Sequence, residues 1–369
     1  MFSNILLESY PQALNFYNQA LPIFREIRDR EWEAGALNNI GIAYSDLENY
    51  QQTLNFYNQA LQIYREIRDR EGEAHTLTSI AWNYGNMESR PQELSFYNQA
   101  LQIYREIQNR EREALVLNNL GVAYSDLENY QQSLSFYNQA LPIFRDVRDQ
   151  QGEAEMLFGI GVNYRELENH QQALIFLNQA LPIYRGLQNR EREADTLSNL
   201  GWNYEKLENH QQAVNFHNQA LPIYRGLQNR EREADTLSNL GWNYENLENY
   251  RQALSFYNQA LVIYRGLQNR QREADMLNGI GWSHYRLESY QDALTFYNQA
   301  LPIYRGLRNR EGEARVLRNI AWVYDDMNNL RQALNFYQQA LPIYRELGDR
   351  ESIDGVQRNI NSIYNHLGI

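Results

Sequence analysis

The stretch NQALPIYRGLQNREREADTLSNLGWNYE occupies residues 178–205 and occurs again, unchanged, at residues 218–245. Its first four letters belong to a longer series with a constant spacing of 40 residues: Asn-Gln-Ala-Leu begins at positions 18, 58, 98, 138, 178, 218, 258 and 298, and Gln-Gln-Ala-Leu follows at 338. A fixed period without insertions predicts an architecture in which each unit packs on its neighbours. Complete identity of two copies indicates a recent duplication, so that identity is weak evidence for a functional site.

Each unit has the pattern of two helices. In the first complete unit, apolar residues recur every three or four positions, which is the spacing of one helix face. The first helix has its stripe at Ala34, Leu37, Ile40, Gly41, Tyr44 and Leu47, and the second at Leu54, Tyr57, Ala60, Leu61, Tyr64 and Ile67. No stretch alternates in the manner of a β-strand, so the predicted fold class is all-α.

Composition excludes several classes of function. The chain has 369 residues, a net charge of −12 and no cysteine, which excludes disulfides, thiolate metal sites and cysteine nucleophiles. The negative charge disfavours binding to nucleic acid. The sequence has neither a run long enough to cross a membrane nor the pattern of a signal peptide at its start. We therefore expect a cytoplasmic protein without nucleic-acid or membrane partners.

The spacing Leu37-x2-Ile40-Gly41-x2-Tyr44, followed by Tyr57 and Ala60, resembles the tetratricopeptide repeat over essentially the whole chain. The resemblance implies a right-handed superhelical α-solenoid of antiparallel helix pairs. The common period of that repeat is 34, and the six additional residues after Ala60 predict a lengthened second helix. Such longer units resemble the repeats of kinesin light chains and cell-polarity adaptors. The Ala-Leu-Pro-Ile-Tyr-Arg phrase is similar to bacterial, especially cyanobacterial, versions, which often form the sensor or interaction part of larger proteins.

The repeat boundaries predict three parts. Residues 1–30 form a partial N-terminal unit, with a short helix remnant over Phe2–Leu7 followed by a second helix over Pro11–Arg28. Residues 31–350 form eight complete units. Residues 351–369 form a C-terminal cap helix, because the usual apolar positions there are polar: Asp354, Gln357 and Asn361. Terminal units of a solenoid need such a solvated face.

A search for catalytic chemistry finds no motif of a hydrolase, a metal site or a phosphate loop. Four of the six histidines, His170, His210, His217 and His284, occupy positions that are tyrosine in most other units. The simplest interpretation is that one ring replaces another, and a metal or acid–base role is the alternative. The many carboxylates lie at helix starts and turns, where a solvated face explains them. We expect no enzyme, no cofactor and no metal.

The candidate site is a stripe on the first helices, at positions 35, 38, 42 and 45 and their equivalents. In the tetratricopeptide repeat this stripe lines the concave groove that binds peptides. Aspartate and tryptophan seven residues apart share one helix face and suit arginine or lysine, whereas the later units carry arginine. The predicted ligand is a protein or an extended peptide with a basic middle and an acidic stretch or carboxylate end. The predicted groove residues are Asp195, Ser198, Asn199, Trp202, Asp235, Ser238, Asn239, Trp242, Asp275, Asn278, Trp282, Arg315, Arg318, Trp322 and Arg358.

Structural alternatives remain open for each part of this stripe. The tryptophans can instead pack between neighbouring first helices, and the aspartates can cap helices or stay solvated. The asparagines at position 39 and its equivalents, including Asn199 and Asn239, can hold a peptide backbone or bridge adjacent helices.

The sequence thus favours a peptide-binding scaffold, used as an interaction or sensor module. One alternative is a solenoid that self-assembles into a homo-oligomer through its N-terminal end, whose apolar positions show no polar substitution. The other is a regulatory fragment of a larger signalling or protease protein. A nucleic-acid reader built from helical repeats is disfavoured by the charge.

Overall fold

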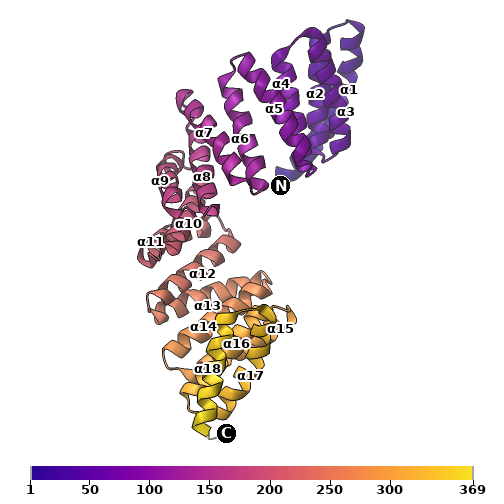
Figure 1. Cartoon of the computed structure of the whole chain (residues 1–369). Helices are drawn as coiled ribbons and strands as arrows, with labels where there is room; N and C mark the ends of the chain where they lie inside the picture. Colours follow the sequence, from indigo (N-terminus) through magenta and orange to yellow (C-terminus); the bar gives the residue numbers. More distant parts are fainter. Residues whose placement is uncertain (1, 368–369) are drawn as a thin grey trace. The chain divides into compact units, whose positions relative to one another are not determined.

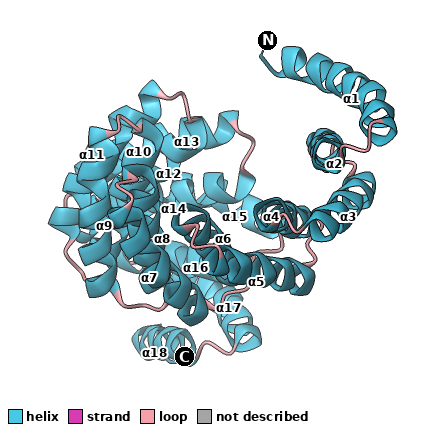
Figure 2. Cartoon of the chain, turned by 90° about the horizontal axis from the view of Figure 1, so that it is seen from above, coloured by secondary structure: helices cyan, strands magenta, loops and turns pink. Residues whose placement is uncertain are grey.

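The computed structural model describes residues 2–367, and the side chains of residues 12–367. Within this part of the chain every regular element is an α-helix, as Figure 2 shows. The helices are α1 (Phe2–Glu26), α2 (Arg30–Asp46), α3 (Tyr50–Ile67), α4 (Arg70–Asn86), α5 (Arg90–Glu106), α6 (Arg110–Asp126), α7 (Tyr130–Asp146), α8 (Gln150–Glu166), α9 (His170–Gly186), α10 (Arg190–Lys206), α11 (His210–Gly226), α12 (Arg230–Asn246), α13 (Tyr250–Gly266), α14 (Arg270–Arg286), α15 (Tyr290–Gly306), α16 (Arg310–Asp326), α17 (Leu330–Leu347) and α18 (Arg350–Leu367). The predicted all-α class is confirmed. Among the described residues, no helix is long and apolar enough to cross a membrane.

The chain forms two compact units, Met1–Ile183 and Tyr184–Ile369. In the second unit, helices α12 to α18 follow one another in chain order (Figure 1), and each packs on the next. The alternate helices α12, α14 and α16 also touch one another. Each of these two compact units is therefore a solenoid of helix pairs. In the second one, α12, α14 and α16, the first helices of successive repeats, lie next to one another on one side of the solenoid.

The connections between helices are nearly identical. After α6, Glu128 has a left-handed backbone conformation with a φ of 57°. The Glu128 N–H donates to the Ser125 carbonyl, and the Asn129 N–H donates to the Tyr124 carbonyl, which is the Schellman arrangement that ends a helix. Asn129 then caps α7, because its side chain accepts from the Gln132 N–H. Both α6 and α7 have 17 residues, so the two helices of this pair are equal in length.

Rings and glycines explain the close packing inside each helix pair. A Cβ added at Gly241 would lie 2.5 Å from the Tyr257 ring, so the missing side chain gives that ring its place. On the neighbouring face, Tyr244 stacks on Phe256 with ring centroids 5.4 Å apart. His284 stacks on Phe296 at the same centroid distance, which confirms for this histidine that one ring replaces another.

Two expectations from the sequence need correction. The carboxylates at helix starts are not all solvated: Glu233 is only 4% exposed, because Arg225 binds it at 2.9 Å and Arg230 also pairs with it. The same pair of arginines recurs on the equivalent buried glutamate of several other units. At the N-terminus, α1 runs unbroken from Phe2 to Glu26. The expected break after Phe2–Leu7 is absent.

The two end helices differ in their exposed faces. On α1, Phe16 and Ile23 are 68% and 56% exposed. On α18, by contrast, Val356 and Ile360 are buried in the core shared with α17, whereas Asp354 is exposed. The division into a partial unit, eight complete units and a cap stays a prediction.

Candidate functional site

The predicted groove residues lie on the first helices of the second unit, at equivalent positions of successive repeats. α10 carries Asp195, Ser198, Asn199 and Trp202, and α12 carries Asp235, Ser238, Asn239 and Trp242; α14 has Asp275, Asn278 and Trp282, α16 has Arg315, Arg318 and Trp322, and α18 has Arg358. Residues three, four and seven apart share a helix face, and α14 contacts both α12 and α16. The side chains on α12, α14 and α16 therefore form one wall.

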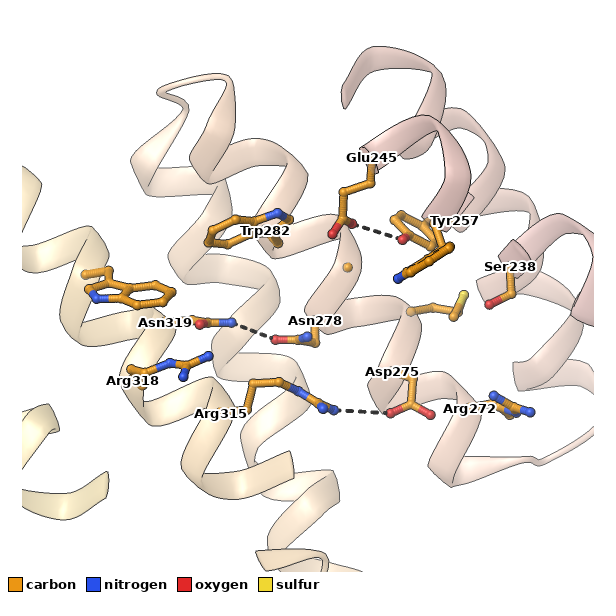
Figure 3. A pocket seen from close by; sticks show the side chains of 14 residues that line it. Ser238, Glu245, Tyr257, Arg272, Asp275, Asn278, Trp282, Arg315, Arg318 and Asn319 are labelled. Carbon is orange, nitrogen blue, oxygen red and sulfur yellow. Dashed lines mark hydrogen bonds and ion pairs between the residues drawn. The ribbon is translucent and has the colours of Figure 1, made fainter. Parts of the chain in front are cut away.

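A pocket of about 450 Å³ opens in this wall between α12, α14 and α16 (Figure 3). Of the predicted residues, it brings together Ser238, Trp242, Asp275, Asn278, Trp282, Arg315, Arg318 and Trp322. A second pocket of about 650 Å³ lies beside α18 and places Arg358 with Arg318 and Trp322. Neither pocket includes Asp195, Ser198, Asn199, Trp202, Asp235 or Asn239.

Each groove aspartate is held by a buried tyrosine of the following helix. Tyr264 donates a 2.7 Å hydrogen bond to Asp235 Oδ1, and Tyr304 donates an equivalent bond to Asp275 Oδ1. In the preceding unit Tyr224 does the same for Asp195. Burial and the neighbouring carboxylate raise the pKa of Tyr264 well above its usual value. These aspartates are therefore fixed in place, which neither capping nor simple solvation describes.

Arg315 and Arg318 supply positive charge to the pocket. The Arg315 Nη2 lies 3.8 Å from Asp275 Oδ1, and the Arg318 guanidinium lies over the Trp322 ring at 4.6 Å. The Nε atoms of both arginines are buried and make no hydrogen bond. Guanidinium groups pair well with carboxylates and phosphates. The two arginines can therefore bind an anionic group that enters the pocket.

The tryptophans do not all behave alike. Trp282 and Trp322 lie against each other across α14 and α16, with ring centroids 5.9 Å apart. Packing between first helices, the structural alternative, is therefore correct for this pair. Trp242 on α12 is 43% exposed and lines the pocket. Its ring and that of His210 form a T-shaped pair, with ring centroids 5.2 Å apart.

Two of the asparagines at position 39 and its equivalents bridge helices, as the structural alternative states, whereas Asn199 bonds within its own helix. Asn319 Nδ2 donates to Asn278 Oδ1 at 3.1 Å and so bridges α16 and α14, as Figure 3 shows. Asn359 Nδ2 donates to the Tyr337 hydroxyl. Asn199 Nδ2 donates to the Asp195 carbonyl of its own helix.

Six of the pocket residues were not among the predicted site residues, and two of them, Glu245 and Tyr257, bond to each other. Tyr257 donates a 2.9 Å hydrogen bond to Glu245 Oε2. Burial raises the pKa of Glu245 to about 7, although the Tyr257 hydrogen bond and the charge of Arg286 act against the increase. The sequence did offer a signal for Glu245, because this residue is the equivalent of position 45 in the groove stripe.

The histidines give no indication of a metal centre. His217 is fully buried, and its Nε2 lies 2.8 Å from Glu205 Oε1. Asn243 donates to the same carboxylate oxygen, and its Oδ1 lies 3.1 Å from the Nδ1 of His210. The residues that the structure describes contain no group of three or more potential metal ligands.

Comparison with known proteins identifies the family. A model of the tetratricopeptide repeat matches residues 3–66, 32–106, 112–186 and 272–346, and two further models of this repeat match residues 194–227 and 236–271. These matches cover more than half of the chain. The protein belongs to the tetratricopeptide repeat family, as its sequence pattern indicated. No curated protein matches the sequence.

Solved structures with this fold have low sequence identity to the chain. The STAND protein with a tetratricopeptide repeat sensor from Pyrococcus horikoshii has a TM-score of 0.65 and 15% identity, over 95% of this chain and 54% of that one. The apo quorum sensor NprR from B. thuringiensis has a TM-score of 0.55 and 16% identity, over 94% and 95% of the two chains. BtubC from P. vanneervenii has 0.53 and 19%, over 60% and 90%. At these identities the likeness shows a common fold.

Proposed function

We propose that the protein is an interaction module that binds a peptide segment of a partner protein along the groove of the second unit. The observation that supports this proposal most directly is the pair Arg315 and Arg318, whose buried Nε atoms have no hydrogen-bond partner beside a pocket of about 450 Å³. A buried donor without a partner carries a cost in free energy. An anionic ligand group removes that cost and supplies the opposite charge.

The ligand that fits this groove has charges of both signs. An acidic side chain or terminal carboxylate binds at Arg315 and Arg318, with Arg358 near the end of the groove. Basic residues face the row of aspartates at Asp195 and Asp235. Because Tyr224 and Tyr264 hydrogen-bond to these aspartates through single carboxylate oxygens, each carboxylate retains capacity to accept from a ligand.

The names of two structural neighbours fit this kind of role. One is a quorum sensor, and the other carries a tetratricopeptide repeat sensor within a larger signal transduction ATPase. We assign this chain a comparable role as an interaction or sensor module, with no catalytic step, and place it in the cytoplasm. It can act alone or as the regulatory part of a larger protein.

A peptide display experiment on the full chain tests the proposal. Random peptides are selected against the wild type and against the double variant Arg315→Gln/Arg318→Gln, after circular dichroism has shown equal helicity. We expect acidic residues to be enriched by the wild type, and selected peptides to bind the double variant about tenfold or more weakly. The control is Arg308→Gln in a turn outside the groove, where other units naturally have glutamine. An acidic preference that survives the double substitution contradicts the proposal.

Self-association through α1 is a second candidate, favoured by the exposed apolar side chains of Phe16 and Ile23 on this helix and of Ile27 directly after it. Exposed apolar patches on soluble proteins often mark interaction surfaces. Light scattering across a range of concentrations tests it. A homo-oligomer requires the mass to rise with concentration for the wild type and to stay monomeric for Phe16→Ser/Ile23→Ser. A concentration-independent monomer mass for the wild type excludes it.

A further inference from the structure

Four tryptophans occupy equivalent positions on the first helices of the second unit. Three of them make a cation–π contact with a lysine or arginine of the same chain. The Lys206 ammonium lies 5.0 Å from the Trp202 ring centroid. The Arg286 guanidinium lies 5.5 Å from Trp282, and that of Arg318 lies 4.6 Å from Trp322. Each cation is four residues from its tryptophan, and this spacing places it over the ring.

Trp242 is the exception. The residues four positions before and after it are Ser238 and Asn246, and neither can carry a positive charge. Within the described part of the chain, no lysine or arginine lies over the Trp242 ring. The ring is 43% exposed, whereas the other three tryptophans are less exposed. Trp242 therefore offers an aromatic face for a cation from another molecule.

The carboxylate of Glu245 lines the same pocket as the Trp242 ring. Glu245 lies three residues after Trp242 on α12, so both side chains point into the same pocket, which Trp282 also lines. Figure 3 shows Glu245 directed toward Tyr257 beside Trp282. Among the described residues Glu245 has no ion pair, and its hydrogen bond comes from Tyr257. A partly buried carboxylate without a direct ion pair carries a cost in free energy, and a bound cation supplies that ion pair.

We propose that Trp242, Glu245 and Trp282 form a subsite for the positively charged side chain of an arginine or lysine in the bound peptide. This inference rests on the proposed function, since it assigns one side chain of the same ligand. The anionic group of the ligand lies toward Arg315 and Arg318, on the other side of the pocket (Figure 3). The pocket thus selects a peptide with adjacent opposite charges.

The surroundings of Glu245 predict that binding depends on pH. The groups that face it are Tyr250 and Tyr257 from α13, Arg286 from α14 and Tyr297 from α15. Glu205 of α10 lies near Tyr257, and His210 contacts Trp242. Burial raises the pKa of Glu245 to about 7, and a cation favours the ionised form. Binding therefore releases a proton near neutral pH and strengthens as the pH rises from about 6 to 8.

The duplicated units provide a matched test, because Asn246 stands where the preceding unit has Lys206. In the variant Asn246→Lys, the new ammonium is expected to cover Trp242 as Lys206 covers Trp202, and so to compete with a ligand. Glu245→Gln keeps the shape of the side chain and removes its charge. The control is Trp82→Leu, since Trp82 is also an exposed tryptophan at the same repeat position but has Gly85 three residues on.

The probes are N-acetyl-arginine methylamide and its uncharged analogue N-acetyl-citrulline methylamide. The full chain is labelled with 5-fluorotryptophan, and Trp242→Phe identifies the fluorine resonance of Trp242. We expect the arginine probe to shift this resonance at concentrations at which the citrulline probe does not. Asn246→Lys and Glu245→Gln each weaken the arginine probe about tenfold, and Trp82→Leu leaves its affinity unchanged. Calorimetry in two buffers detects the released proton, which Glu245→Gln abolishes.

Equal shifts with the arginine and citrulline probes overturn the inference, as does undiminished binding of the arginine probe by Asn246→Lys. A third probe, N-acetyl-aspartate methylamide, separates this inference from the proposed function. If the aspartate probe binds through Arg315 and Arg318 while the arginine probe does not bind, the cation subsite is wrong and the peptide groove stands. If none of the selected peptides and neither charged probe binds, both are overturned.

Discussion

The hydroxyl of Tyr264 donates a 2.7 Å hydrogen bond to Asp235 Oδ1, 29 residues earlier in the sequence. The bond joins α13 to α12, the two helices of one repeat. Tyr264→Phe removes this bond and is expected to lower the free energy of unfolding by about 1 kcal/mol, because the acceptor is charged but partly exposed. Urea denaturation followed by circular dichroism measures the change.

Tyr64→Phe is the matched control for that experiment. Tyr64 has the same repeat position as Tyr264, but the residue 29 positions before it is Gly35, which has no carboxylate. Tyr64→Phe is therefore expected to lower the free energy of unfolding less than Tyr264→Phe does. If both variants lose the same stability, the tyrosine–aspartate bond contributes nothing of its own.

The buried glutamate at the start of each first helix predicts a larger loss. Glu233→Gln leaves Arg225 and Arg230 without the anion that both bind. We expect a loss of about 1–3 kcal/mol in the free energy of unfolding, at the lower end of values for buried pairs because both arginines are about half exposed. Glu231→Gln, at an exposed position two residues earlier, serves as the reference and should change stability little.

The left-handed turns can be improved. Glu248 has a φ of 56°, a conformation that L-residues adopt at a cost of about 1 kcal/mol and glycine adopts freely. Glu248→Gly is expected to raise the thermal midpoint, and also to remove a negative charge from a helix C-terminus.

Position 348 supplies the reverse substitution, because Gly348 has a φ of 71° in the left-handed turn that follows α17. Gly348→Ala should lower the thermal midpoint. Calorimetry that finds the two variants shifted in the same direction would contradict the assignment of strain to these turns.

Glu245 also predicts how stability changes with pH. Its pKa is raised from 4.5 to about 7 in the folded chain, mainly by burial, so the folded state holds this proton more tightly than the unfolded state. The contribution of Glu245 to stability therefore falls as the pH rises from about 4.5 to 7 and stays constant above that range, with a total of about 3 kcal/mol at most. Comparing wild type with Glu245→Gln in urea at several pH values isolates this part, and parallel curves for the two proteins refute it.

The sequence predicted the helices and their order because the apolar stripes that indicate each helix recur every 40 residues. The stripe at Leu37, Ile40 and Tyr44 defines the core face of the first helix. Because the stripe recurs every 40 residues, the opposite face of each first helix is predicted at the same positions of every repeat. The pocket between α12, α14 and α16 was also anticipated in part, since most of its charged and aromatic residues lie on the predicted stripe.

The remaining features depend on contacts between helices, which the pattern within one helix does not contain. The bond between Tyr264 and Asp235 needs the relative rotation of α13 and α12. The burial of Glu233 depends on how Arg225 folds back from the preceding helix. The role of Glu245 depends on the partner that reaches it, which is a tyrosine here and a histidine for Glu205 in the duplicated unit.

The nearly constant turn has an evolutionary consequence. Because Glu128, Glu248 and their equivalents close each helix with the same backbone geometry, a whole 40-residue unit can be gained or lost by recombination between gene segments without creating a new junction. Repeat arrays tolerate such changes because each unit contacts only its neighbours. Unequal crossing-over can then lengthen or shorten the recognition surface in discrete steps, and each added copy can diverge at a few groove positions while its scaffold stays the same.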